Sequence, residues 1–358
     1  MSRKFDPYLV ESAAKVLDVL ELFRTGREEL TLAEVSEVLG LPKSTAFRLL
    51  YTLESKGYLE RVPETSRHRR KRRRVGLLTA SLRIPFALAM AQSVQSAARE
   101  SGVQLLIAPS DLAGSRTLAN VEQLLQSGIE LLIAFNPVER ISAQIAERCM
   151  RGGVPVVAVT FPLPGAVTFG VDCYRAGLDG GQGFGQHVSQ CWRSGPDRVV
   201  LLDSPDSGGP QQARMAGMLD GLKKTSPLAG ESVLRMNAPR LDEQPRKLMF
   251  RYLRQHPDER VVVLATNDTY ALDALHAVED AGRESSVCIL GQGGVAEVRQ
   301  ELRRASSPLW GTVAHFPEQF GRKLIPIALG ILQGAHVGSS VYTEHALLTR
   351  RNLASYYQ

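Results

Sequence analysis

The sequence has few of the residues from which metal and disulfide scaffolds are built. It contains four cysteines, Cys149, Cys173, Cys191 and Cys288, and no two of them form a Cys-x-x-Cys pair. His187 stands four residues before Cys191 and could share a helix face with it, but ordinary packing explains such a pair better than a metal site does. We therefore expect no bound metal and no cofactor.

Long apolar runs are also missing. No run approaches the roughly 18 residues that a membrane-spanning helix needs. Glu11, Lys15 and Asp18 interrupt the apolar residues near the start of the chain, so we expect no secretory leader. The sequence therefore predicts a cytoplasmic protein with no membrane partner, which argues against an exported transport receptor.

Positive charge is concentrated in the first fifth of the chain. Residues 1–75 contain 16 Lys or Arg against 11 Asp or Glu, whereas the remainder contains 27 against 26. The densest run is 67–74, which holds seven Lys or Arg and one His. A concentrated basic patch is typical of a protein with a polyanionic partner. This run therefore predicts contact with nucleic acid, and a solvated, disordered linker is the alternative.

Three helical patterns precede the basic run. The first spans residues 11–23, and the second begins with a capping box formed by Thr31 and Glu34 and ends at Gly40. The third starts at Pro42. The apolar face of the first helix is Ala13, Val16, Leu17, Leu20 and Phe23, and that of the third is Ala46, Leu49, Leu50 and Leu53.

A strand, a turn and a basic returning strand follow the third helix. This order predicts a winged helix-turn-helix, whose second motif helix lies in the major groove of DNA with its N-terminal residues at the base edges. The alternative is a surface helix with unrelated polar residues. Short hydrogen-bonding side chains and cations suit base-edge and phosphate contacts. We expect DNA contacts from Thr31, Lys43, Ser44, Thr45, Phe47, Arg48, Arg67, Arg69, Arg70 and Lys71.

The stretch LTLAEVSEVLGLPKSTAFRLLYTLESKGYLER closely resembles the DNA-binding domain of IclR-type transcription factors. The resemblance covers about residues 9–70. It implies that residues 42–48 open the recognition helix and that the domain works as a dimer. After the wing, the chain does not resemble the usual effector domain of that family.

From Val75 onward, short apolar strands alternate with helices, and the pattern restarts after about residue 164. Such alternation predicts parallel sheets that are covered on both faces. The fold class is therefore α/β: a winged helix-turn-helix followed by two doubly wound lobes, with a ligand cleft at the carboxyl ends of the strands. The expected domains are 1–73 and 74–358. The expected first lobe is 74–163 with 294–335, and the expected second lobe is 164–293 with 336–358.

Several motifs of the second domain resemble the sensor domain of ribose-binding proteins and LacI-type regulators, which is like a periplasmic binding protein. SLRIPF points to Phe86, QQARMAG to Arg214, VLATNDTYALDAL to Asn267 and Asp268, and GTVAHFPEQFGRKL to His315, while EHALLTRRNL looks like the closing strand. The resemblance covers roughly 74–358. It implies a bilobed fold, a cleft for sugars and related polyols, and dimerisation.

The residue chemistry fits a sugar independently of that resemblance. A sugar needs planar groups such as those of Arg214 and Asn267, and an aromatic platform such as Phe86. The alternatives are that Phe86 is core, that Arg214 is a surface cation and that His315 is structural. The expected ligand-binding residues are Phe86, Thr160, Phe161, Arg214, Asn267, Asp268, Gln292 and His315.

Two positions depart from the ribose-binding pattern. Thr160 and Phe161 stand where ribose binders carry Asp-Arg, and Gln292 stands where they carry Asp. Ribose itself is therefore not expected. A cleft with Arg83 and Arg214, and with Arg175 as a third candidate, predicts a sugar acid or a phosphosugar.

Two other motifs suggest functions that their context excludes. PDSGGP, which contains Ser207, and TVAH imitate serine protease motifs, but their order is reversed and their surroundings are α/β. We expect Ser207 to lie in a loop. DGGQGFG imitates a dinucleotide loop but lacks its final glycine, and close helix packing explains it as well.

The sequence as a whole predicts a ligand-responsive transcriptional regulator, and either repression or activation fits it. Its expected partners are a double-stranded DNA operator, a sugar, polyol or sugar-acid effector, and a second copy of the chain. We expect no enzyme, because no convergent acid–base pair is visible. The alternative is a cytoplasmic carbohydrate-binding protein or carbohydrate-processing enzyme that does not bind DNA.

Overall fold

The computed structural model describes residues 8–23, 29–110, 114–204, 208–228, 232–238 and 244–357. The chain divides between Arg73 and Arg74 into an N-terminal unit, Met1–Arg73, and a C-terminal unit, Arg74–Gln358. Ser207, for which we expect a loop position, lies outside the described residues.

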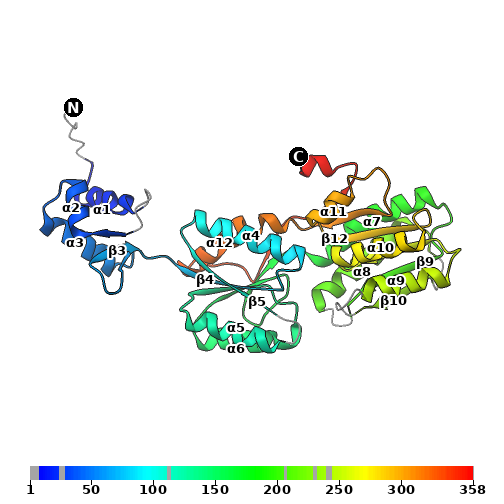
Figure 1. Cartoon of the computed structure of the whole chain (residues 1–358), viewed down its shortest axis with the longest axis horizontal. Coiled ribbons are helices and arrows are strands. Elements are labelled where there is room, and N and C mark those ends of the chain that lie inside the picture. Colours follow the sequence, from blue (N-terminus) through cyan, green and yellow to red (C-terminus); the bar gives the residue numbers. More distant parts are fainter. Residues whose placement is uncertain are drawn as a thin grey trace. The chain divides into compact units, whose positions relative to one another are not determined.

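The N-terminal unit contains three helices and a three-stranded antiparallel sheet of order β1-β3-β2 (Figure 1). Its elements are α1 (Glu11–Leu22), β1 (Glu29–Thr31), α2 (Leu32–Leu39), α3 (Lys43–Ser55), β2 (Leu59–Arg61) and β3 (Arg67–Arg70). The strand β1 was not expected from the sequence. It is recognised only through its partner, because Leu30 pairs with His68 of β3.

Local signals explain where α2 begins and ends. Thr31 Oγ1 accepts a hydrogen bond from the Glu34 backbone N–H at 3.2 Å, and the Thr31 backbone N–H donates to Glu34 Oε2 at 2.7 Å. The predicted capping box is therefore confirmed. Gly40 ends the helix with φ of 61°, a left-handed conformation that glycine adopts without strain.

The expected apolar face of α1 needs correction at two residues, since Ala13 is exposed as well as Leu17. Leu17 is 61% exposed, whereas Val19 is fully buried. Val16, Val19, Leu20 and Phe23 follow the i, i+3, i+4, i+7 spacing of one helical face, and Leu17 lies off that face. They pack against the core formed by α2, α3 and β2.

The first lobe of the C-terminal unit contains a six-stranded sheet of order β14-β8-β7-β6-β4-β5, and all of its pairs are parallel (Figure 1). Helices α4 and α12 cover one face, and α5 and α6 cover the other. The elements are β4 (Arg74–Thr79), α4 (Pro85–Glu100), β5 (Gln104–Pro109), α5 (Ser115–Gln126), β6 (Leu131–Ala134), η1 (Glu139–Ile141), α6 (Ser142–Arg151), β7 (Val156–Val159), β8 (Val167–Gly170), α12 (Phe320–Leu332) and β14 (Ser340–Tyr342).

The second lobe contains a six-stranded sheet of order β10-β9-β11-β12-β13-β15, in which only the pair of β13 and β15 is antiparallel among the described strands. The elements are α7 (Cys173–Cys191), β9 (Arg198–Asp203), α8 (Gly209–Thr225), β10 (Val233–Asn237), α9 (Gln244–Gln255), β11 (Val261–Ala265), α10 (Asp268–Ala281), β12 (Val287–Gly293), α11 (Ala296–Glu301), β13 (Leu309–Ala314), η2 (Pro317–Gln319), β15 (Ala346–Thr349) and α13 (Leu353–Tyr356).

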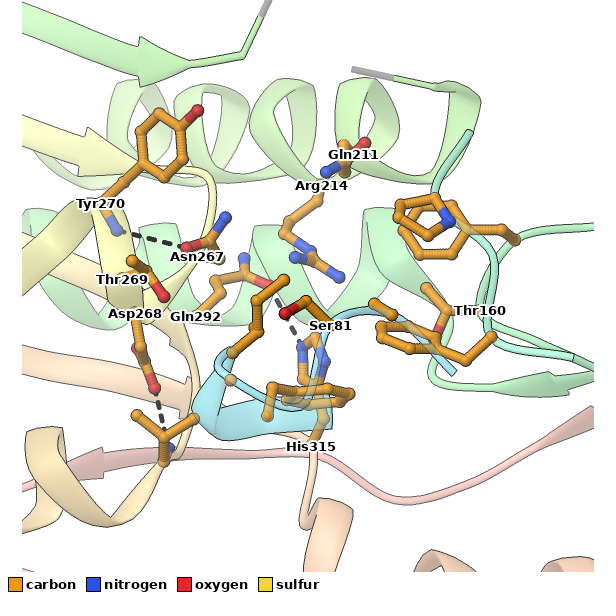
Figure 2. A pocket seen from close by; sticks show the side chains of 18 of the residues that line it. Ser81, Thr160, Gln211, Arg214, Asn267, Asp268, Thr269, Tyr270, Gln292 and His315 are labelled. Carbon is orange, nitrogen blue, oxygen red and sulfur yellow. Dashed lines mark hydrogen bonds between the residues drawn. The ribbon is translucent and has the colours of Figure 1, made fainter. Parts of the chain in front are cut away.

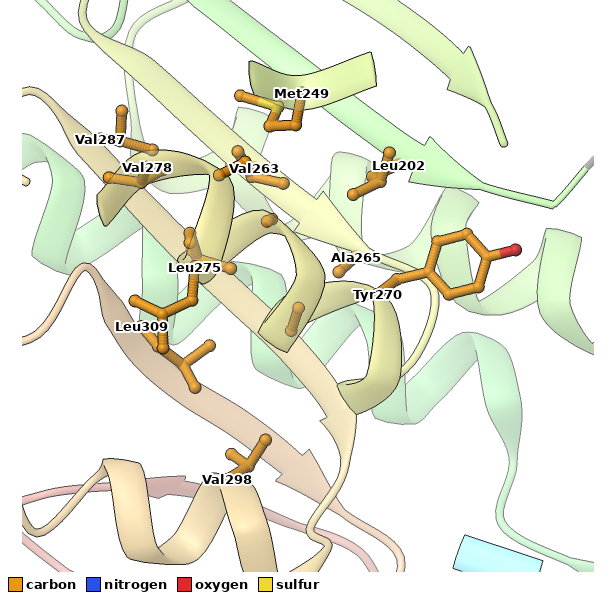
Figure 3. Close-up of a cluster of buried hydrophobic side chains, with 14 of the residues drawn as sticks. Leu202, Met249, Val263, Ala265, Tyr270, Leu275, Val278, Val287, Val298 and Leu309 are labelled. Atoms are coloured by element: carbon orange, nitrogen blue, oxygen red, sulfur yellow. The ribbon is translucent and has the colours of Figure 1, made fainter. Parts of the chain in front are cut away.

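The second sheet separates two apolar layers. Figure 3 shows one layer, in which Val263 and Ala265 of β11 pack with Leu275 and Val278 of α10 and with Met249 of α9. Helices α7 and α8 cover the opposite face. The fully apolar strands are thus buried on both sides, as their composition predicts.

The expected lobe boundaries are wrong in three places. Residues 167–170 form β8 of the first sheet, residues 294–314 belong to the second lobe through β13, and residues 340–342 return to the first sheet as β14. The chain therefore crosses between the lobes after β8, after β13 and after β14. Hydrogen-bond partners decide to which sheet a strand belongs, and the alternation of apolar strands and helices does not encode that choice.

Candidate functional site

Helix α3 presents a polar face and buries an apolar one. Ala46, Leu50 and Leu53 are buried in the N-terminal core. Lys43, Ser44, Phe47 and Arg48, four of the expected DNA contacts, are exposed, and Thr45 is half-buried. The face that the sequence assigns to DNA is therefore accessible within this unit.

Sequence reasoning missed an aromatic pair on the same helix. The ring of Phe47 stacks on that of Tyr51, with the centroids 6.2 Å apart, and the two side chains are 49% and 61% exposed. An i, i+4 spacing places them side by side on the helix surface. The spacing was readable in the sequence, but the exposure of both rings was not.

The basic run divides into cations with different surroundings. Arg69 Nε donates to Glu60 Oε1 at 2.7 Å, and Arg67 Nη1 donates to the Glu29 carbonyl at 3.1 Å. Arg70 and Lys71 are exposed and have no ion-pair partner among the described residues. Arg74, the last residue of the basic run, belongs to β4, where its backbone N–H donates to Glu130 Oε1 at 3.0 Å.

Two residues near the wing have internal roles. Thr31, expected at DNA, engages both its hydroxyl and its backbone N–H in the capping box with Glu34. His68 is buried, 3.6 Å from Glu54, and burial lowers its pKa. The structure thus explains both residues by the stability of the N-terminal unit.

A cavity of about 410 Å³ lies between the two lobes of the C-terminal unit (Figure 2). This volume is within the ordinary range for small-molecule sites. All the ligand-binding candidates line it: Phe86, Thr160, Phe161, Arg214, Asn267, Asp268, Gln292 and His315. Lining residues that sequence reasoning missed include Ser81, Ser110, Phe135, Gln211, Tyr270 and Asp273.

The first lobe supplies an aromatic wall. The ring centroids of Phe86 and Phe135 are 5.8 Å apart, and those of Phe135 and Phe161 are 5.5 Å apart. His315 meets Phe86 edge-on at 6.2 Å. Such a wall suits the apolar face of a ring-shaped ligand. Phe135 directly follows β6, so the position of a strand's carboxyl end was the signal that could have found it.

Thr160 enters the cavity from a strained backbone. Its φ is 64°, a left-handed conformation that a β-branched residue rarely adopts. Its backbone N–H donates to the Phe169 carbonyl at 2.8 Å, and a Cβ on Gly170 would lie 3.4 Å from it. The crossing strand β8 therefore holds Thr160 in place, and Figure 2 shows its side chain at the cavity.

Arg214 reaches the cavity from α8. Its Nη1 donates to the Thr266 carbonyl at 2.9 Å, its Nη2 lies 3.9 Å from Cys173 Sγ, and its buried Nε has no hydrogen-bond partner. Close helix packing fixes its position, because a Cβ on Gly177 of α7 would lie 2.2 Å from the Arg214 carbonyl oxygen. The glycines around the DGGQGFG stretch thus serve the contact between α7 and α8.

Asp268 is the fully buried carboxylate of the cavity wall. Thr312 Oγ1 donates to its Oδ1 at 2.6 Å, and the Val295 backbone N–H donates to its Oδ2 at 2.9 Å. Burial raises its pKa to about 6, against the opposing effect of these hydrogen bonds. The neighbouring Asn267 caps α10, because its Oδ1 accepts from the Tyr270 backbone N–H at 3.2 Å.

His315 and Gln292 form a neutral pair. His315 Nε2 lies 3.2 Å from Gln292 Oε1, which can only accept, so His315 donates through Nε2. Burial, assisted by the charge of Arg214, lowers the pKa of His315 well below its ordinary value. Gln292 Nε2 is buried without a hydrogen-bond partner.

Two candidates lie apart from the cavity. Arg175 is not among its lining residues; it pairs with Asp179 at 3.1 Å on the exposed side of α7. Cys191 Sγ lies 3.5 Å from His187 Nε2, and His187 stacks on Trp310 with the centroids 4.9 Å apart. Packing therefore accounts for this pair.

Over the described ranges, no group of three or more His, Cys, Asp or Glu is arranged to hold a metal ion. In the same ranges, no helix combines the length and the apolar character that crossing a membrane requires.

Comparison with known protein families identifies both parts of the chain. The model of the periplasmic binding protein domain matches residues 75–336, and the model of the IclR helix-turn-helix domain matches residues 12–63. The predicted N-terminal motif and the predicted sensor-type fold are thereby confirmed.

Curated relatives match one part or the other. The ribose import binding protein RbsB of Bacillus subtilis is 25% identical over 280 residues, 77% of this chain and 87% of that protein. The transcriptional regulator XynR of Escherichia coli is 36% identical over 61 residues, 17% of this chain and 24% of that protein. The transcriptional regulator PtxS of Pseudomonas plecoglossicida is 24% identical over 229 residues, 59% of this chain and 65% of that protein.

Solved structures show the same fold. A periplasmic solute-binding protein from Actinobacillus succinogenes with bound D-allose superposes with a TM-score of 0.68 at 17% identity. The superposition covers 80% of this chain and 100% of that one. At this identity the likeness concerns the fold alone.

Proposed function

We propose that the chain, which belongs to the periplasmic binding protein domain family over residues 75–336, is a transcriptional regulator controlled by a sugar-class ligand. Its IclR-type helix-turn-helix domain over residues 12–63 supports this proposal. The ligand occupies the cavity between the lobes, and the N-terminal unit binds double-stranded DNA. Because its proposed partner is DNA, we expect the protein to act in the cell compartment that contains DNA.

One observation carries the ligand half of this proposal. Eight residues spread from Phe86 to His315 converge on one cavity, which has an aromatic wall and a polar wall. The relatives that match this part include a protein named for ribose import, and a solved structure of the same fold holds D-allose. A ring-shaped ligand with several hydroxyl groups fits both walls.

The DNA half rests on the exposed face of α3. The recognition helix contacts base edges and the adjoining phosphates through Lys43, Ser44, Phe47 and Arg48. The wing contacts phosphates through Arg70 and Lys71. The protein acts as a homodimer, so that its operator has two half-sites.

Ligand control follows from the three chain crossings between the lobes. A ligand that contacts both walls binds the closed lobes more tightly than the open ones, and this difference shifts the equilibrium between the two states. Closure then changes how the two DNA-binding units of the dimer are held. Coupling of this kind is typically 1–3 kcal/mol and is reciprocal between the two sites.

The cavity binds its ligand without catalysing a reaction. Asp268 accepts hydrogen bonds from Thr312 and Val295, and His315 pairs with an amide rather than with a carboxylate. General acid–base catalysis needs a carboxylate or histidine that is free to exchange a proton with substrate.

The test is selection of duplex DNA by the full-length protein from a random pool. The proposal expects enrichment of a two-part sequence and a change in its affinity when a cavity ligand is added. Failure to enrich any duplex would remove the DNA-binding half and favour a carbohydrate-binding protein without a DNA target.

A further inference from the structure

Arg214 is a buried cation without a salt bridge. Its exposed fraction is 7%, and no salt bridge joins it to a carboxylate among the residues that the structure describes, although its charge opposes the rise that burial causes in the pKa of Asp268. Its closest oxygen partner is the neutral carbonyl of Thr266 at 2.9 Å. Burying a charge without a salt bridge is costly, so an anion bound beside Arg214 would offset part of that cost.

Two hydrogen-bond donors in the side chains that line the cavity lack a hydrogen-bond partner. Arg214 Nε and Gln292 Nε2 are both buried without a hydrogen-bond partner, and both side chains border the same cavity (Figure 2). A buried donor without an acceptor costs about 1–3 kcal/mol. The missing complement is therefore a ligand group that accepts at two points.

Asp268 does not supply that complement. Both of its carboxylate oxygens already accept hydrogen bonds, one from the Thr312 hydroxyl and the other from the Val295 backbone N–H. The other acidic side chain at the cavity, Asp273, is half-buried and has an interaction of its own. Neither carboxylate forms a salt bridge with Arg214 in the described parts of the chain.

A second cation faces the cavity from the opposite lobe. Arg83 lies in the loop between β4 and α4, lines the cavity and is exposed. Its guanidinium has no hydrogen-bond or ion-pair partner in the ranges that the structure covers. The two arginines therefore contribute positive potential to the cavity from both lobes. A negatively charged ligand would attract both of them and so favour the approach of one lobe to the other.

We propose that the cavity selects a sugar acid, a monosaccharide with one carboxylate, over neutral sugars. The carboxylate pairs with the guanidinium of Arg214 beside the amide of Gln292, while the sugar ring packs on Phe86, Phe135 and Phe161. A planar group with two oxygens and one charge matches two donors and one unpaired buried cation better than a phosphate does. This inference rests on the proposed function, since it takes the cavity to be the effector site.

The experiment measures binding to the full-length protein by calorimetry, without DNA. The probes are two sets of sugars: glucose, glucuronate and glucose 6-phosphate; and galactose, galacturonate and galactose 6-phosphate. The expected result is that the acid of at least one set binds at least about tenfold tighter than both of its counterparts, since one 1.4 kcal/mol contact is worth a factor of ten.

Two variants locate the preference. Arg214→Gln removes the cation, and the acid should lose its advantage, so that the affinity ratio falls to about one. Gln292→Glu supplies a carboxylate beside Arg214, which should reverse the preference in favour of the neutral sugar. Arg175→Gln is the matched control, because Arg175 is an exposed arginine paired with Asp179 away from the cavity, and it should keep the wild-type ratio.

The outcomes separate this inference from the proposed function. Tighter binding of the neutral or phosphorylated member in every set, or no binding of any acid at 10 mM (roughly 2.7 kcal/mol of affinity), would overturn the sugar acid. A neutral sugar that still changes DNA affinity would leave the proposed regulator in place. An acid that binds without changing DNA affinity would overturn the regulator and leave the ligand class standing.

Discussion

Neighbouring arginines of the wing differ in whether the guanidinium is already paired with a carboxylate of the protein. Arg69 is already paired with Glu60, whereas Arg70, the next residue, points away from that pair and is exposed. Successive side chains of a strand alternate between its two faces, which explains the difference. A dense run of cations in the sequence therefore overstates the number that is free to bind DNA.

Arg70→Ala should weaken DNA binding for all sequences about equally, because Arg70 contacts phosphate rather than bases. The dependence of log affinity on log salt should become less steep by about 0.9, the contribution of one neutralised phosphate. Fluorescence anisotropy over a salt series measures this slope. Arg69→Ala is the control, since Glu60 already neutralises that charge, and a larger effect of Arg69→Ala than of Arg70→Ala would refute the assignment.

Asp268 makes stability depend on pH. Its pKa of about 6 in the folded protein is higher than the ordinary 3.8, so the folded state binds the proton more tightly. Its stabilising contribution is present below pH 3.8 and is lost as pH rises through 6. Wild type should therefore lose about 2.5 kcal/mol relative to Asp268→Asn between pH 4 and pH 7.

Urea unfolding of both proteins over that pH range measures the difference. The two curves share every other titrating group, so their difference isolates Asp268. A constant difference between pH 4 and pH 7 would show that the carboxylate is not desolvated in the folded protein.

Several residues of the cavity wall were predictable from the sequence because its motifs resemble those of a known sensor domain, whose fold places functional side chains at one edge of its sheets. Phe86, Asn267 and His315 each follow a strand, and the carboxyl ends of parallel strands meet at one edge. Arg175 failed this rule because it lies on the exposed side of α7. Arg214 and Gln292 each have a buried nitrogen without a hydrogen-bond partner. This depends on distances between helices and strands, which cannot be read from a sequence pattern.

Among the elements, α7 and α8 pack with their backbones in close contact. A Cβ on Gly181 would lie 2.1 Å from the Met218 carbonyl, and one on Gly217 would lie 2.2 Å from the Tyr174 carbonyl. Glycine permits this approach because it has no Cβ, although it costs helix propensity. The pair matters for function because α8 carries Arg214.

Gly181→Ala should destabilise the protein by more than 1 kcal/mol, since the backbones of α7 and α8 must separate to admit the methyl group. Urea unfolding measures the loss. The control is Gly209→Ala at the start of α8, where an added Cβ would meet nothing within 4 Å. Equal stability of the two variants would contradict the packing account.

The elements that sequence reasoning missed are those whose identity depends on a partner. The strands β1 and β14 have three residues each and β8 has four, so none carries a clear periodic pattern. The helices and the longer buried strands were predictable from capping residues, glycine stops and apolar runs. The lobe to which each strand belongs was not, because sheet membership is set by hydrogen bonds between distant segments.

At the scale of the molecule, two units with separate chemistry share one chain. The N-terminal unit has its own core around Val19, Val35 and Leu50, and the C-terminal unit has separate cores in its two lobes. A ligand that binds only the C-terminal unit should stabilise that unit directly. For the chain to act as a regulator, part of that binding free energy must reach the DNA-binding unit.

The measurement that tests this claim most directly is the affinity of full-length protein for its selected duplex, by fluorescence anisotropy, with and without the tightest-binding sugar of the panel. The account predicts a change of about 5- to 150-fold for wild type, and none for Arg214→Gln at the same sugar concentration. An unchanged affinity of wild type at saturating sugar would contradict it.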